Sequence, residues 1–82
     1  MPGVMDAAEV RTSYIEQWAP LAKEYLERYV ADRSWQYTEA NIQAVRNLVE
    51  ACGGVDLALA DLQKRGLNPK VTEEVFRTFA AL

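Results

Sequence analysis

Residues 35–70, WQYTEANIQAVRNLVEACGGVDLALADLQKRGLNPK, decide the fold because they hold the densest set of helix start and stop signals in the chain. Thr38 can cap a helix, and Glu39 in the first turn complements the helix dipole. Apolar side chains then recur at helical spacing: Ile42, Val45, Leu48, Val49 and Cys52. A Gly-Gly pair follows, and glycine readily takes the left-handed conformation that ends a helix. We therefore predict a helix over residues 39–52.

A second helix is predicted immediately after Gly53-Gly54, over residues 55–65. Its apolar face is formed by Val55, Ala58, Leu59 and Leu62. Gly66 fits the left-handed position after the helix, and Leu67 can contact Leu62 as in a Schellman motif. A connection as short as Gly-Gly makes the two helices neighbours. We expect this helix-GlyGly-helix hairpin to lie at the centre of the fold.

The N-terminal segment is predicted to be helical from Ala7, with residues 1–5 disordered. Asp6 suits the N-cap, and Glu9 stands three residues later as in a capping box. Pro20 leaves two alternatives open, because proline lacks the amide that a helix interior needs. Either one long helix bends there, or a helix over 7–18 ends and another starts at Pro20 and runs to residue 32.

The last helix is expected to start at Asn68-Pro69, with asparagine as N-cap and proline in the first position. Its apolar face would comprise Val71, Val75, Phe76, Phe79 and Leu82, and Glu73 would pair with Arg77. No strand pattern is present. The sequence therefore predicts one all-α domain over residues 1–82, a compact bundle of four to five short helices around the central hairpin.

Composition narrows the function classes. The 82 residues are 50% hydrophobic and carry a net charge of −3, with a pI near 4.8, which argues against a general affinity for nucleic acid or anionic membrane. The single cysteine, Cys52, excludes an intrachain disulfide and suits a reducing compartment. The first residues lack the basic start and apolar run of a signal peptide. We expect a cytoplasmic protein.

Catalysis is not expected. The chain has no histidine, the usual acid–base residue, and no glycine-rich loop that could hold a phosphate. Cys52 lies on the apolar side of its predicted helix, where a thiol behaves as a small hydrophobic group. The acidic residues are scattered without the spacing of a metal site. We predict neither an enzyme nor a bound cofactor or metal.

Aromatic residues are the best candidates for a binding surface. Tyrosine and tryptophan combine a large apolar ring with a polar tip and dominate protein-binding hot spots. The candidates are Tyr14, Trp18, Tyr25, Tyr29 and Trp35. The alternative is that these rings cover the core and point their polar atoms to water. We expect a non-catalytic protein-binding module, such as an adaptor, assembly factor or inhibitor of a larger complex. Its size and charge are typical of phage and mobile-element products, and a homodimer would add to its small core.

A DNA-binding regulator is the alternative. The segment LVEACGG…ALADLQKRGLNP resembles the C-terminal helix-turn-helix of Fis-type regulators, and this resemblance implies DNA binding. A basic patch would then consist of Lys64, Arg65, Lys70 and Arg77. Three residues separate Leu62 from Gly66, more than that motif's compact turn has, and the would-be recognition helix carries Glu73 and Glu74. The segment LVEACGGVDLALADL also resembles ubiquitin-associated domains, without their Met-Gly-Phe loop. We assign the chain to neither family.

Overall fold

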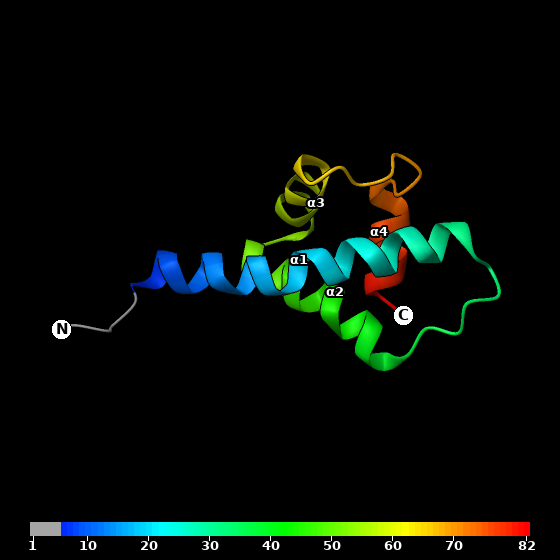
Figure 1. The fold of residues 1–82 in the computed structure, drawn as a ribbon, viewed down its shortest axis with the longest axis horizontal. Helices are drawn as coiled ribbons and strands as arrows, with labels where there is room; N and C mark the ends of the chain where they lie inside the picture. The colour runs from blue at the N-terminus through cyan, green and yellow to red at the C-terminus, as the bar shows by residue number, and fades with distance from the viewer. Residues whose placement is uncertain (1–5) are drawn as a thin grey trace.

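The computed structural model describes residues 6–82, and within this range the chain is all-helical (Figure 1). It forms four helices and no strand: α1 (Ala7–Ala31), α2 (Glu39–Cys52), α3 (Val55–Lys64) and α4 (Glu73–Ala80). The all-α class is confirmed for these residues. The expected disorder of residues 1–5 lies outside the described residues.

Helix α1 begins at Ala7 as predicted, because the Asp6 carboxylate accepts a hydrogen bond from the Glu9 amide at 2.9 Å. It continues through Pro20 as one helix of 25 residues, so the alternative of two separate helices is wrong. A proline inside a helix costs about 3 kcal/mol. Ala19 and Ala22 on either side of the proline are fully buried, and burial of this face offsets that cost.

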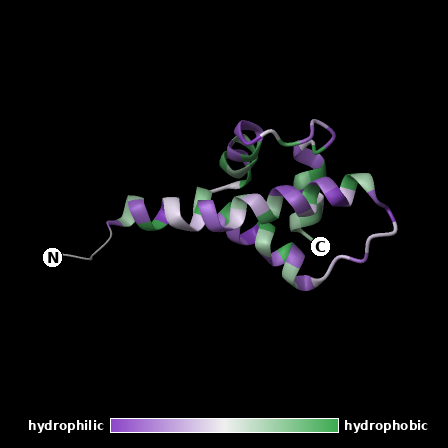
Figure 2. Ribbon diagram, in the orientation of Figure 1, coloured by the Kyte–Doolittle hydropathy of each residue, from purple (hydrophilic) through white to green (hydrophobic). Residues whose placement is uncertain are grey.

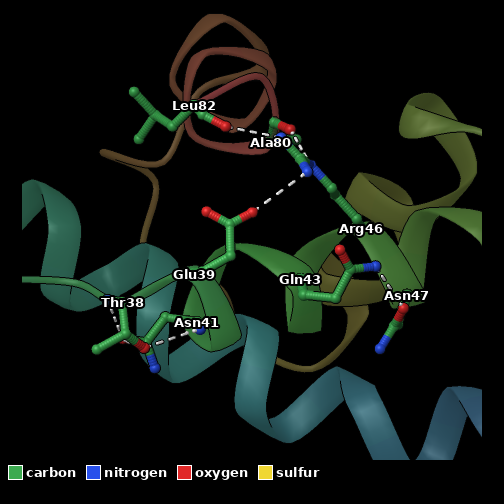
Figure 3. Close-up of polar contacts among 8 residues, drawn as sticks. All are labelled: Thr38, Glu39, Asn41, Gln43, Arg46, Asn47, Ala80 and Leu82. Atoms are coloured by element: carbon green, nitrogen blue, oxygen red, sulfur yellow. Dashed lines mark hydrogen bonds and ion pairs between the residues drawn. The ribbon is translucent and has the colours of Figure 1, made fainter.

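Helix α2 begins after Thr38, as predicted, and contacts each of the other three helices, α1 most extensively. The Thr38 hydroxyl accepts from the Asn41 amide, and the Asn41 side chain accepts from the Thr38 amide at 2.8 Å (Figure 3). This reciprocal cap satisfies two amides that the helix leaves open. At the other end, Gly53 adopts a left-handed φ of 91° and stops the helix.

Helix α3 ends in the predicted Schellman motif. The Leu67 amide donates to the Leu62 carbonyl at 3.0 Å, and the Gly66 amide donates to the Gln63 carbonyl at 3.1 Å. Gly66 has a φ of 83°, a conformation in which glycine is strongly favoured. The chain therefore leaves α3 in a defined direction.

The predicted start of the last helix at Asn68-Pro69 is wrong. Asn68 instead forms a turn, in which its side chain accepts from the Lys70 amide at 2.9 Å and its carbonyl accepts from the Val71 amide at 2.9 Å. The Thr72 hydroxyl caps α4 by accepting from the Val75 amide at 3.2 Å. The turn carries Val71 into the core, where it is almost fully buried. The later cap therefore gains burial that the earlier one would not provide.

One hydrophobic core joins all four helices. It contains Ala19, Ala22, Leu26, Ile42, Val45, Leu48, Cys52, Ala58, Leu62, Leu67, Val71, Phe76 and Phe79. Arg46 fastens the end of α4 to α2, since it donates to the carbonyl oxygens of Ala80 and Leu82, both at 2.7 Å (Figure 3). In Figure 2, α1 carries hydrophobic residues along its whole length, including the N-terminal part that extends beyond the other helices. The hydrophobic core does not extend to this N-terminal part of α1, since its first α1 member is Ala19.

Candidate functional site

The predicted aromatic residues lie in two separate places. Three of them, Tyr25, Tyr29 and Trp35, belong to an aromatic cluster that Tyr37 and Phe79 complete. The Tyr29 ring meets Phe79 edge-on at 5.0 Å between centroids and Tyr37 at 5.7 Å. Trp35 stacks on Tyr25 at 6.1 Å. These rings contact one another, and all except Tyr37, which is 38% exposed, belong to the core or pack against it.

A polar turn positions the loop residues of the aromatic cluster. The Asp32 carboxylate accepts from the hydroxyl of Ser34 at 2.6 Å and from its amide at 3.0 Å, and these bonds lower the pKa of Asp32. The Arg28 guanidinium lies over the Trp35 ring, 5.4 Å from its centroid. The loop between α1 and α2 is thus held against both α1 and α4.

The other two aromatic candidates, Tyr14 and Trp18, line a groove between α1 and α2. This α1–α2 groove has a volume of about 670 Å³. Its walls are Ala7, Val10, Arg11, Tyr14 and Trp18 from α1 and Asn47, Glu50 and Ala51 from α2. Tyr14 is 52% exposed and Val10 is 36% exposed, whereas Trp18 is half-buried and anchors the groove to the core. The groove therefore offers an apolar surface that nothing in residues 6–82 covers.

Several groove residues were not predicted from the sequence. Val10 precedes Tyr14 by four residues and Trp18 by eight, so helical spacing could have added it to the aromatic line. The α2 wall of Asn47, Glu50 and Ala51 carries no comparable signal. These residues join the groove only because α1 crosses α2 at this point (Figure 1).

The groove carries one positive and one negative side chain, Arg11 and Glu50. Both are exposed, and the six salt bridges formed within residues 6–82 include neither of them. The other charged side chains of residues 6–82 divide about equally between ion-paired ones and unpaired ones; Lys23, for example, pairs with Glu27 at 3.3 Å. The charges of the groove thus remain available to an external partner.

Two of the four residues of the predicted basic patch are paired with acidic neighbours. Arg65 pairs with Glu16 at 2.9 Å and with Asp61 at 2.8 Å, and the hydrogen bond to Arg65 lowers the pKa of Glu16. Arg77 pairs with Glu73, as predicted, at 3.1 Å, and also with Asp56 at 3.2 Å. The remaining members, Lys64 and Lys70, are exposed and lie at the end of α3 and in the following turn.

The single thiol is buried and unreactive, and the acidic residues are dispersed over residues 6–82. Cys52 is buried, and its burial raises the pKa of the thiol, so the thiol stays protonated and packs as an apolar group. Residues 6–82 contain no group of three or more cysteine and acidic side chains that could hold a metal ion. None of the four helices is both long enough and apolar enough to cross a membrane.

No protein-family model, curated protein or solved structure matches the chain.

Proposed function

We propose that the protein is a non-catalytic protein-binding module and that the α1–α2 groove is its binding surface. The observation that carries this proposal is the position of Tyr14, a half-exposed aromatic ring in a groove between two helices. Val10 and Trp18 lie one helical turn before and after it, and such i, i+4, i+8 spacing is how a helix presents anchors to a partner. Tyrosine and tryptophan are also the residues most enriched in binding hot spots.

The remainder of the chain serves this groove as a scaffold in our proposal. Helix α2 supplies one wall and α1, which packs against it, supplies the other, while α3 and α4 support α2 from the core. An adaptor, an assembly factor or an inhibitor of a larger complex would each use such a surface without performing chemistry. A cytoplasmic location suits the protonated, buried Cys52.

A quantitative affinity capture from a lysate of the native host tests this proposal. The baits are the wild-type chain, Tyr14→Ala and Leu57→Ala; Leu57 is 58% exposed on α3 and lies outside the groove, so it is the matched control. We expect at least one protein to be captured equally by wild type and Leu57→Ala and about tenfold less by Tyr14→Ala. If Tyr14→Ala leaves every captured protein unchanged, the groove is not the binding surface.

DNA binding through α3 and α4 has weaker support. A recognition helix approaches DNA with its N-terminal residues, and α4 begins with the exposed carboxylates of Glu73 and Glu74. Arg65 and Arg77 are already paired with carboxylates, so few positive charges remain for the phosphates. Fluorescence anisotropy with a mixed-sequence duplex at low salt should show no binding at micromolar protein. Saturable binding there would move the site from the groove to α4.

A further inference from the structure

The N-terminal part of α1 presents an exposed apolar ridge that forms one wall of the groove. Val10 and Tyr14 lie one helical turn apart on this ridge, and their side chains are 36% and 52% exposed. Figure 1 shows this part of α1 extending past the other helices, where no element of residues 6–82 lies over it. The α1 wall of the groove is therefore an exposed apolar helix face against which a second helix can pack.

The charges of the groove specify what its occupant must carry. Arg11 and Glu50 are both exposed and neither is paired within residues 6–82, so an occupant that carries one acidic and one basic group would complement the groove. A second copy of the same chain carries one of each beside the same apolar wall. In a two-fold symmetric pair, each Arg11 would face the Glu50 of the other copy.

We propose that the occupant of the α1–α2 groove is the N-terminal part of α1 from a second copy, in a two-fold symmetric dimer. This inference rests on the proposed function, because it names the partner of the same groove. The axis runs perpendicular to α1, so the two helices are antiparallel and each Tyr14 enters the groove of the other copy. Two symmetry-related Arg11–Glu50 contacts border this apolar centre and fix the register.

Sedimentation velocity over a concentration series tests the pairing. We expect wild type and the control Leu57→Glu to dimerise, with Tyr14→Glu weakening self-association by at least about 30-fold. Circular dichroism checks that each variant is folded, and the substituted residues are all exposed. Wild type that remains monomeric up to about 1 mM, the weakest affinity of a specific contact, overturns the proposal. A dimer that Tyr14→Glu does not weaken also overturns it, because another surface then makes the contact.

Charge exchange tests the two-fold register itself. Arg11→Glu places two acids opposite each other at both contacts, and Glu50→Arg places two bases there, so each variant alone should dimerise about 10 to 100-fold more weakly. An equimolar mixture of the two variants should associate as well as wild type, since each of the two contacts in their heterodimer again joins one acid to one base. A mixture that stays as weak as its components overturns the proposed register.

The two proposals fail in distinguishable ways. If the wild-type chain is monomeric but still captures a protein in a Tyr14-dependent manner, the groove binds a different protein and only the self-pairing is wrong. If the chain is monomeric and its captures do not depend on Tyr14, both proposals fail. Self-association that depends on Tyr14 and is restored in the charge-exchanged mixture supports both.

Discussion

Replacing Tyr29 with alanine should lower the free energy of unfolding by about 3–5 kcal/mol, whereas the same change at Tyr14 should alter it by less than about 0.5 kcal/mol. Both tyrosines lie on α1, and the two substitutions remove identical atoms. Only the surroundings differ. Tyr29 belongs to the aromatic cluster, and Tyr14 is half-exposed in the groove.

The magnitude for Tyr29 follows from its contacts. Loss of about 80–100 Å² of buried ring surface costs about 2–2.5 kcal/mol. The edge-to-face contacts with Phe79 and Tyr37 add about 0.5–1.5 kcal/mol each. A domain of 82 residues has a total stability of about 4–12 kcal/mol, so this substitution removes a large share of it. The melting temperature should fall by at least about 12 °C.

Urea denaturation followed by circular dichroism at 222 nm measures both changes, at a protein concentration low enough for every variant to be monomeric, and thermal melts provide a second estimate. Tyr29→Phe is the control, since it keeps the ring and removes only the hydroxyl; we expect it to cost less than about 1 kcal/mol. Equal destabilisation by Tyr14→Ala and Tyr29→Ala would refute the division of the aromatic residues into a packing cluster and an exposed groove. A near-neutral Tyr29→Ala would refute it as well.

Three further predictions concern single contacts. Arg46→Ala should cost about 1.5–3 kcal/mol in urea denaturation because it removes two 2.7 Å hydrogen bonds to the end of α4, whereas Glu39→Gln should be near neutral because its 3.8 Å ion pair is exposed. The hydrogen bond from Arg65 lowers the pKa of Glu16 below its ordinary 4.5, so the stability that Glu16 contributes is present above about pH 4.5 and is lost as the pH falls through the lowered value. Wild type and Glu16→Gln should therefore converge in urea midpoint between pH 6 and pH 3; a constant difference would contradict this linkage. Gly53→Ala should destabilise the chain by about 1–2 kcal/mol through its φ of 91° alone, since the added methyl would meet Leu57 at an ordinary 3.7 Å; an unchanged melting temperature would show that the turn relaxes.

Local signals made the helix ends predictable from the sequence. The caps at Asp6 and Thr38 and the stop at Gly66 each depend on residues within one turn, so the sequence alone contains the whole cause. The start of the last helix could not be predicted from local signals in the same way. Asn68 and Thr72 are both good caps, and the choice between them depends on the burial of Val71, which only the assembled core decides.

The candidate site also depends on tertiary packing that local sequence patterns do not determine. Helical periodicity predicts that Tyr14 and Tyr29 lie in one aromatic line along α1, but it does not tell where along the helix the other elements end. Because α1 extends past its neighbours, one tyrosine is left exposed and the other packs against Phe79. Glu50 enters the groove through the crossing of two helices, a relation that no local pattern encodes.

The continuity of α1 through Pro20 has a mechanical consequence. Proline cannot donate to the carbonyl of Glu16, so the turn between them is the most weakly bonded one in the helix. The proline lies within the part of α1 that packs in the core, because Ala19 and Ala22 on either side of it are fully buried. The missing hydrogen bond is therefore enclosed by packed side chains, and α1 can bend at Pro20 only if Ala19 or Ala22 leaves the core. The core thus keeps the two walls of the groove in a fixed relation even though the helix itself is weakest at this turn.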